Sequence, residues 1–566
     1  MPTTIDANEL PLREIFNDNY RFLVPHYQRP YSWRIEQTME LLEDLTNAAG
    51  SAQDVSSADP YFLGSIVLTK ESNQTKADVV DGQQRLTTLT ILLAVLRDLA
   101  EDDDLKHSLQ SKIWNPGNKA EGTKSEYRLT QRERDSLFFQ KNIQTIGAIT
   151  EFIKGTVPKH SSEIRMFENA KRLHCALIKR TKGERERLGQ FLLTRCYVVV
   201  VATPSLESAY RIFSVLNSRG LALRQVDLLK ADIIGEISSS SRRRHTDEWE
   251  DIEEGMGDEE FQQLFNHIYM INRRTRPPTS SASDYRIGII GEDTCRSVEE
   301  KVAARESFLE ETLPTYKSCF DVVAEESFDE PKAIATNEAL EHLRRLPSGE
   351  NHWIPVAMET VRLYGGAIES LNRIFPALER LAYTMFIQRM TREQRVTRWA
   401  RVLRAMKKGL DQTLVATNLS ETENDGLVKR LASPIDNDRR RVLLLRLDCI
   451  LAESIASYQY SRITVEHVLP QNPNDDSQWI KSFPDPEERE EWTHKIANLV
   501  LLSRSKNSKA QNFDFERKKR EYFEKGKSPR LEITNNVLKH QTWTPRVLKR
   551  RQAAIIDLFK KEWQLK

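Results

Sequence analysis

The sequence predicts an α+β fold that is mostly helical. Three observations support this prediction. Short β-branched segments alternate with helical segments in the first 235 residues, apolar residues recur at helical spacing through residues 295–418, and residues 463–513 have the order strand, strand, helix. A chain of 566 residues is too long for one core, so several domains are expected. We predict an N-terminal domain at 1–237, a helical connecting region at 238–414 and a C-terminal domain at 415–566.

The composition is that of an ordinary soluble protein, with 30% charged and 39% hydrophobic residues. The first residues show no basic and apolar leader, and no uncharged apolar run is long enough to span a bilayer. We therefore expect a cytoplasmic protein without a membrane partner. The five cysteines are scattered without a Cys-x-x-Cys pair, so neither a disulfide framework nor a zinc site is predicted.

In the N-terminal region, residues 22–33 (FLVPHYQRPYSW) are predicted to form a structured loop, because their prolines favour extended neighbours. A helix is expected at about 34–49, and strands at 61–68 and 77–80. The second strand runs into the sequence DGQQR, which is followed by a strongly apolar helix. Another strand, YVVVV, is expected at 197–201.

A strand, a tight glycine turn and a helix N-terminus together favour an anion. Gly82 allows the backbone to approach a ligand closely, and Arg85 adds a guanidinium that can contact a phosphate. Most turns of this kind are purely structural, and that alternative stays open here. The helix that follows residue 206 is predicted to end at the Asn-x-Arg-Gly turn of Asn217 and Arg219, and the next helix carries Asp227 and Lys230.

These segments together resemble the DUF262 domain, a ParB/sulfiredoxin-like fold found at the N-terminus of GmrSD-like type IV restriction enzymes. The resemblance implies binding of GTP, ATP or another nucleotide. The nucleotide-binding residues would be Asp81, Gly82, Gln83, Gln84, Arg85, Asn217 and Arg219, and those that sense or bind DNA would be Tyr27, Gln28 and Arg29. No Walker A sequence is present, so a P-loop mechanism is not expected.

The middle of the chain is less informative. Residues 238–260 are polar and charged in blocks, and we predict a loop or linker there. Residues 273–278 are predicted to form a second loop. The remainder, to residue 418, is predicted to be a helical bundle that positions the other domains.

Near the C-terminus, a strand is predicted to end at Glu466 and His467, shortly before Pro470. A second strand is predicted at 498–502, followed by a helix that carries Asn507. An imidazole with a pKa near ~6.5 can act as a general base at neutral pH, and His467 is the candidate.

Oxygen ligands suit Mg²⁺, and Glu466 and Asn507 could supply them. Asn498 could orient the imidazole or could hold the two strands together. The alternative interpretation of His467 is an ordinary, partly buried histidine at a strand end. His494 is a weaker candidate for a phosphate contact, because a surface histidine is the commoner case.

The set Glu466-His467-x-x-Pro470, Asn498-Leu499 and Asn507 resembles the HNH (His-Me finger) nucleases, and specifically the DUF1524 domain of the GmrSD-like enzymes. The resemblance implies a ββα fold and cleavage of DNA with Mg²⁺ or Mn²⁺. Many HNH enzymes have Asp or His in place of Glu466.

The chain end is basic. Residues 498–566 contain 18 Lys and Arg against 7 Asp and Glu, a net charge of +11, whereas the whole chain carries only +1. We expect this region to contact DNA phosphates, with Lys518 and Lys519 as candidates.

Two functions follow from the sequence. The first is a nucleotide-regulated, modification-dependent DNA endonuclease or nickase in anti-phage defence, with double-stranded and modified phage DNA as substrate. The second is a nucleotide-responsive, DNA-binding regulatory protein whose nuclease site is silent. The sequence leaves open whether the protein forms a homo-oligomer.

Overall fold

The computed structural model describes residues 6–565 with internal gaps. The gaps are at 27, 51–54, 72–73, 118–121, 206–207, 210–211, 213–224, 279–281, 326, 453–462, 504–511 and 524–530. The chain folds into two compact units, residues 1–250 and 251–566. The three-part division predicted from the sequence stays a prediction.

A mixed sheet of six strands forms the centre of the first unit, in the order β1-β8-β3-β4-β2-β7. β8 runs parallel to β3 and antiparallel to the edge strand β1, while β3 and β4 are antiparallel. The strands are β1 (Asp6–Pro11), β2 (Arg21–Leu23), β3 (Tyr61–Thr69), β4 (Lys76–Asp81), β7 (Leu129–Thr130) and β8 (Cys196–Thr203), and β5 (Trp114–Asn115) pairs separately with β6 (Glu126–Tyr127).

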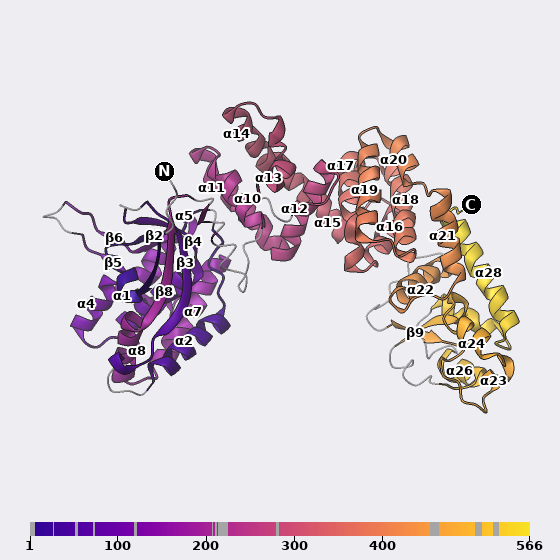
Figure 1. Ribbon diagram of the computed structural model, residues 1–566, viewed down its shortest axis with the longest axis horizontal. Helices are drawn as coiled ribbons and strands as arrows, with labels where there is room; N and C mark the ends of the chain where they lie inside the picture. The colour runs from indigo at the N-terminus through magenta and orange to yellow at the C-terminus, as the bar shows by residue number, and fades with distance from the viewer. Residues whose placement is uncertain are drawn as a thin grey trace. The chain divides into compact units, whose positions relative to one another are not determined.

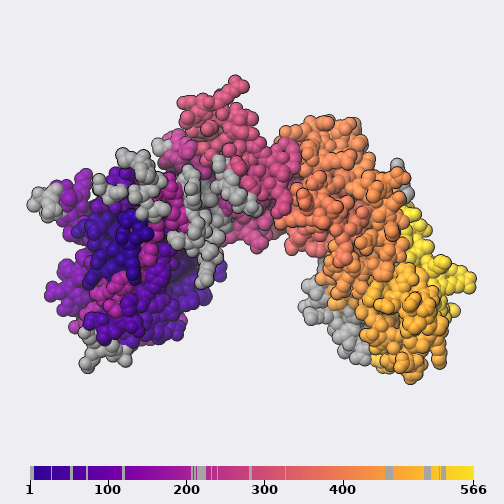
Figure 2. All heavy atoms as spheres, in the orientation of Figure 1, coloured from indigo at the N-terminus to yellow at the C-terminus, as the bar shows by residue number. Residues whose placement is uncertain are grey.

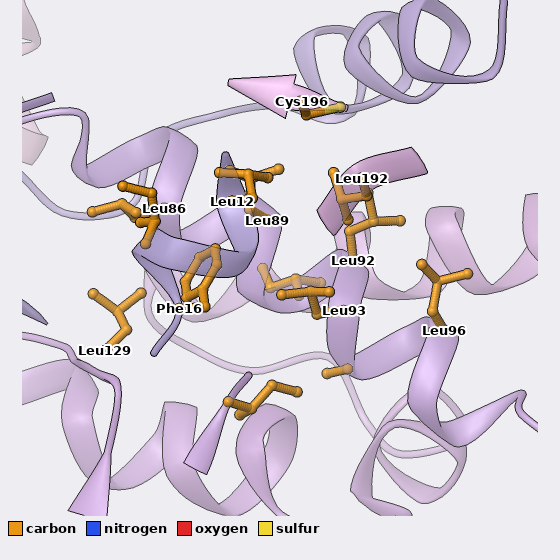
Figure 3. Close-up of a cluster of buried hydrophobic side chains, with 14 of the residues drawn as sticks. Leu12, Phe16, Leu86, Leu89, Leu92, Leu93, Leu96, Leu129, Leu192 and Cys196 are labelled. Carbon is orange, nitrogen blue, oxygen red and sulfur yellow. The ribbon is translucent and has the colours of Figure 1, made fainter. Parts of the chain in front are cut away.

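The predicted strands at 61–68, 77–80 and 197–201 are confirmed. β8 forms because its run of valines favours extended backbone and is covered on both faces. Helix α3 (Gln83–Asp98), which follows β4 directly, is buried almost all round. Its leucines pack with residues of α1, β7, α8 and β8 in the core cluster of Figure 3.

Helices cover this sheet and complete the unit (Figure 1). α2 and α7 contact each other, and α3 packs against α7 and α8. The helices are α1 (Leu12–Ile15), α2 (Ile35–Ala49), α3, α4 (Asp103–Ser111), α5 (Glu133–Phe139), α6 (Ala148–Phe152), α7 (Ser161–Leu177), α8 (Lys182–Thr194), α10 (Gln225–Gly235) and α11 (Ser239–Met256).

The predicted linker at 238–260 is wrong, because the structure forms helix α11 over most of it. The charged blocks conceal a buried stripe, in which His245, Trp249 and Glu250 turn inward at spacings of four and five residues. Glu250 accepts hydrogen bonds from Arg132 and from Lys230. The polar composition of this segment therefore belongs to a helix whose buried face carries an ion pair.

The second unit begins with a run of helices, as predicted for residues 295–418. Their buried faces carry aromatic and aliphatic side chains at helical spacing, as in α18, which buries Phe375, Tyr383 and Phe386. The helices are α12 (Asp258–Arg273), α13 (Ala282–Ile290), α14 (Val298–Ser307), α15 (Leu313–Ala324), α16 (Ile334–Arg344), α17 (Ile354–Tyr364), α18 (Ile368–Ile387), α19 (Arg392–Met406) and α20 (Leu410–Thr417).

The C-terminal part of this unit is built on a two-stranded sheet. The predicted strands are confirmed as β9 (Ile463–His467) and β10 (Leu499–Ser503), paired antiparallel. Three tryptophans, Trp479, Trp492 and Trp543, contribute to the core beside the sheet. The surrounding helices are α21 (Glu421–Ala432), α22 (Asn437–Ala452), α23 (Gln478–Ser482), α24 (Pro486–Thr493), α26 (Phe515–Lys518), α27 (Glu532–Asn535) and α28 (Pro545–Glu562).

Helix α22 is fixed to this unit by a buried arginine. Arg446 donates to Glu379 of α18 at 2.7 Å and to Glu562 of α28 at 2.5 Å. A buried guanidinium that faces carboxylates holds its helix in one orientation.

Within the described residues, no helix combines the length and the apolarity that crossing a bilayer requires. All five cysteines are free. The mainly helical α+β class is confirmed, while the ParB/sulfiredoxin-like and ββα assignments stay predictions.

Candidate functional site

The end of β9 is held by a buried asparagine on the neighbouring chain segment. The Asn498 side chain accepts hydrogen bonds from the Leu469 backbone N–H at 2.8 Å and from Trp543 Nε1 at 3.0 Å. Its amide nitrogen donates to the carbonyls of Leu469 and Thr493, at 2.9 and 3.0 Å. The Asn498 amide is fully buried, and its hydrogen bonds go to these groups rather than to the His467 ring. The geometry therefore favours the role of holding the strands together.

His467 lies at the last position of β9, opposite Leu499. Its Nε2 atom is 3.5 Å from Arg440 Nη1 and 3.3 Å from His494 Nδ1. An arginine has only donors, so Nε2 must be the accepting nitrogen and Nδ1 carries the proton of the neutral ring. Gln471 Nε2 lies 3.3 Å from Nδ1, and rotation of that amide by 180° would present its oxygen to the Nδ1 proton.

The surroundings keep this imidazole neutral. Burial lowers the pKa of His467 to about 3, and the charges of Arg440, His494 and Lys518 act in the same direction. Burial and Arg440 also lower the pKa of His494. At neutral pH His467 is therefore in the unprotonated form from which a general base acts, and its lowered pKa makes it a weak base in this arrangement.

Glu466 and Lys518 form a buried ion pair next to His467. Lys518 Nζ donates to Glu466 Oε1 at 2.7 Å and to the His467 carbonyl at 2.8 Å. Burial raises the pKa of Glu466, and Lys518 opposes that rise, while burial lowers the pKa of Lys518. The pair satisfies two groups that would be costly to bury alone.

The placement of Lys518 differs from the expected contact with DNA. Its side chain is fully buried, because its ammonium neutralises Glu466 in the interior. Lys519 is less enclosed, but its ammonium donates to the His540 carbonyl at 2.9 Å. Neither lysine offers a free ammonium at the surface in this arrangement.

The predicted metal ligands do not form a complete site. Glu466 is already neutralised by Lys518, and Asn507 lies outside the described residues. Over the described ranges, no group of three or more His, Cys, Asp and Glu side chains is arranged to hold a metal ion. Among the described residues the one predicted ligand is Glu466, whose carboxylate would have to exchange Lys518 for the ion.

In the first unit, the DGQQR turn follows β4 as predicted. Gly82 has φ of 94°, which favours glycine, and a Cβ there would lie 3.0 Å from Ile66 Cγ1, a tight contact. Asp81 ends β4 opposite Val67.

The glutamines of this turn bind the 22–33 loop. Gln84 Oε1 accepts from the backbone N–H groups of Ser32 and Trp33 at 2.7 and 3.3 Å, and Gln84 Nε2 donates to the Pro30 carbonyl at 3.0 Å. Gln83 Nε2 donates to the carbonyl of Arg29 at 3.1 Å. Both side chains are thereby used to hold the loop in place.

Gln28 and Arg29 fasten the same loop from its own side. Gln28 Nε2 donates to the carbonyls of Val79 and Val80 at 3.1 and 2.9 Å. Arg29 contacts Asp227 of α10 through Nε at 2.9 Å and Nη2 at 2.5 Å. The loop is therefore bonded both to the sheet and to the helix that carries Asp227.

Arg85 points beneath β3. Its Nη1 donates to the Ser65 carbonyl at 2.8 Å, and a Cβ at Gly64, where φ is 95°, would lie 3.1 Å from its Nη2. Burial lowers the pKa of Arg85, and the charge of Asp81 opposes this. A side chain at position 64 would therefore press against the Arg85 guanidinium.

Four predicted site residues lie outside the described part of the chain, namely Tyr27, Asn217, Arg219 and Asn507. The sequence interpretation missed Arg440, Gln471, Arg132 and Glu250. One signal for Arg440 was present: the run Arg439-Arg440-Arg441 stands directly before the apolar stretch of α22.

Comparison with protein families gives two matches. The model for the N-terminal domain of the GmrSD restriction endonuclease matches residues 12–234, and the model for the C-terminal domain of GmrSD restriction endonucleases matches residues 420–558. Together they cover most of the chain, and both candidate sites fall inside the matched ranges. No curated protein matches the chain.

Proposed function

Since the chain belongs to the GmrSD family of restriction endonucleases, we propose that it cuts DNA at the end of β9, with His467 as the general base. The observation that supports this most is the neutral imidazole of His467, whose Nε2 lone pair faces Arg440 and His494. In the proposed step, Nε2 takes a proton from water as the water oxygen bonds to phosphorus. The P–O bond to the leaving ester oxygen breaks, and that oxygen departs with the electron pair and takes a proton from solvent.

The residues around His467 assist this reaction by position. Asn498 fixes the backbone that follows β9, so that the imidazole has a defined place. The ion pair of Glu466 and Lys518 holds the His467 carbonyl from the other side. A base held on both sides loses less entropy on reaching the reactive geometry.

We further propose dependence on modified DNA, regulation by a nucleotide and a role in anti-phage defence. The support for these is the family and the placement of the DGQQR turn at the N-terminus of α3. The requirements for Mg²⁺ or Mn²⁺ and for GTP or ATP are predictions from the sequence. Substitution of Asp81 or Arg85 by Ala is expected to abolish nucleotide turnover, and unchanged turnover would reject that site.

One observation favours the second function, a DNA-binding regulator with a silent nuclease site. Lys518 already neutralises Glu466, so this carboxylate must exchange its partner before it can bind a metal ion. A regulator would retain the DNA-binding surface without needing that exchange.

Cleavage of plasmid DNA separates the two functions. Wild type and His467→Ala are incubated with supercoiled plasmid and with modified phage DNA, in Mg²⁺ or Mn²⁺ and with or without GTP or ATP. We expect nicking or linearisation by the wild type and a loss of about 10²–10⁴-fold in the variant. His540→Ala is the matched control, because the ring of that partly buried histidine lies edge-to-face with Trp543 rather than facing Arg440. Cutting that survives His467→Ala removes the assigned base.

A further inference from the structure

Arg440 lies at the inner side of α22, 9% exposed, with its guanidinium directed at the end of β9. Its Nε donates to the Ile435 carbonyl at 2.8 Å, and its Nη1 lies 3.5 Å from His467 Nε2. Within the described part of the chain, no carboxylate lies within ion-pair distance of Arg440. The nearby Asp436 pairs with Arg389 at 3.2 Å.

Two other buried arginines have a carboxylate partner, whereas Arg551 of α28 donates to two backbone carbonyls. Arg446 faces Glu379 at 2.7 Å, and Arg305 faces Glu292 at 2.5 Å. A buried cation without an anion is costly, and the cost falls when an anion enters. An anionic ligand would therefore neutralise the positive charge of Arg440.

His494 adds a second nitrogen to the same place. It follows α24, and its Nδ1 is 3.3 Å from His467 Nε2, with the two rings at an angle of 77°. The backbone fixes this arrangement, since the Ile435 N–H, just before α22, donates to the His494 carbonyl at 2.9 Å. Three elements therefore bring one guanidinium and two imidazoles together.

We propose that Arg440 and His494 form a binding site for one backbone phosphate of DNA, directly beside His467. The guanidinium offers its remaining N–H groups to the non-bridging oxygens, and His494 contributes a further ring nitrogen. The proposal deepens the nuclease function above and rests on it for the source of the phosphate. It assigns Arg440, which lies outside the sequence motif, to substrate binding.

A phosphate that belongs to a long duplex fits better than free phosphate. The chain end carries a net charge of +11, and α28, which contacts α22, exposes Arg546, Lys549 and Arg550. Figure 2 shows atoms of α28, in yellow, at the surface of this unit. Such charges attract a polyanion over a distance that a single phosphate ion does not span.

A metal ion bound by both histidines is the competing explanation. Two ligand nitrogens about 3.3 Å apart would suit a tetrahedral ion with bonds of about 2.0–2.1 Å. The adjacent guanidinium of Arg440 repels a cation and attracts an anion, so the phosphate is favoured. The experiment includes this alternative as an outcome.

The test measures DNA binding in EDTA, where binding is read without cleavage or metal. Fluorescence anisotropy of a labelled 20-base-pair duplex gives Kd over a series of salt concentrations for wild type, Arg440→Lys, Arg440→Gln and His494→Ala. Loss of one phosphate contact reduces the slope of log Kd against log salt by about 0.9. We expect this reduction in Arg440→Gln, retention of the slope in Arg440→Lys, and weaker binding by His494→Ala.

Arg441→Gln is the matched control, since it removes the same charge from the next residue of α22, which is exposed. Equal slopes in Arg440→Gln and wild type, or equal reductions in Arg440→Gln and Arg441→Gln, would overturn the proposal. Tighter binding of Zn²⁺ by the wild type than by His494→Ala, together with unchanged DNA slopes, would replace it with the metal site. Free inorganic phosphate at 10 mM should compete little with the duplex, and full competition would mean that the site takes phosphate ions alone.

The nuclease proposal can fail separately. DNA that binds with the expected slopes but is never cut by the wild type leaves the phosphate site in place and rejects the nuclease. Cutting by the wild type, together with salt slopes that Arg440→Gln leaves unchanged, supports the nuclease and rejects the phosphate site. Thermal unfolding of each variant confirms that the compared proteins are folded.

Discussion

The turn after β4 and the end of β9 both gather polar side chains at the end of a strand, but they use them differently. Around the DGQQR turn, Gln28, Gln83 and Gln84 direct their amides to backbone groups of the neighbouring segments. At the end of β9, Arg440, His467 and His494 face one another. The first region satisfies these amides internally, whereas the second retains a cation that no carboxylate of the described residues neutralises.

The difference shows how a motif can be divided into scaffold and site. Amide side chains can donate and accept, so they complete the hydrogen bonding of a loop without leaving charge behind. A guanidinium can only donate and stays charged, so an unneutralised one marks a place where an anion can bind. By this criterion Asn498 belongs with the glutamines, although it stands in the nuclease motif.

Asn498→Ala is expected to have the largest effect on stability. The substitution leaves the Leu469 N–H and the Trp543 Nε1–H buried without acceptors, and two carbonyls lose a donor. At about 1–3 kcal/mol for each of the two orphaned donors, the free energy of unfolding should fall by roughly 2–6 kcal/mol. Urea unfolding of the variant measures this loss, with Asn535→Ala as control. A stable but inactive variant would instead favour a direct role for Asn498 at the imidazole.

Lys518→Met should be nearly as damaging, because it leaves the Glu466 carboxylate buried without its cation. Breaking one partner of a buried pair costs about 3–5 kcal/mol, and adding Glu466→Gln should restore part of it. Thermal unfolding of both single variants and the double variant gives the coupling. No recovery in the double variant would show that the ion pair is not the source of the loss.

The same variant tests the predicted metal role of Glu466. Without Lys518, the carboxylate is available to another cation, so Mg²⁺ should raise the Tm of Lys518→Met more than that of the double variant. Equal shifts in the two proteins would remove Glu466 from the set of metal ligands.

The sequence predicted the fold where hydrophobic pattern decides it. The valines of β8 and the apolar run of α3 specify a buried strand and a buried helix without knowledge of their partners. Helix α11 was missed because its inner face is closed by the pairing of Glu250 with Arg132 and Lys230, which lie far apart in sequence. The edge strand β1 was missed because its residues are mostly exposed and polar.

The candidate site was predictable only in part, for a related reason. His467 stands in a local motif with Pro470 and Asn498, so its place at a strand end could be inferred. Its contacts with Arg440 and His494 each span 27 residues and depend on where α22 and the end of α24 lie beside β9. The burial of Lys518 was likewise hidden, since a lysine in a basic segment is usually exposed.

Gln84→Ala tests the scaffold side of the comparison with a smaller expected effect. It removes the acceptor of the Ser32 and Trp33 N–H groups, which should reduce stability by about 1–2 kcal/mol. Hydrogen exchange of these two amides should accelerate, while exchange in β8 changes less. The exposed Gln74→Ala is the control. If Gln84→Ala abolishes nucleotide binding while hydrogen exchange of the Ser32 and Trp33 amides stays slow, Gln84 contacts the nucleotide directly. The turn after β4 would then be a binding site rather than a scaffold.

The smallest effect concerns His26, the half-buried imidazole of the first unit. Burial lowers its pKa to about 4, and the charges of Arg242 and Lys230 act in the same direction. Because the folded pKa lies below 6.5, the unfolded chain binds the proton first, so this contribution is complete above pH 6.5 and is lost as the pH falls toward 4. His26→Gln should remove that part of the pH dependence, measured by urea unfolding. Phosphate at 50 mM should leave the dependence unchanged, since Glu250 already neutralises Lys230 at 2.7 Å. If phosphate reduces the pH dependence of the free energy of unfolding, the first unit also holds a cation that an anion can neutralise. The turn after β4 and the end of β9 would then not differ in having such a cation.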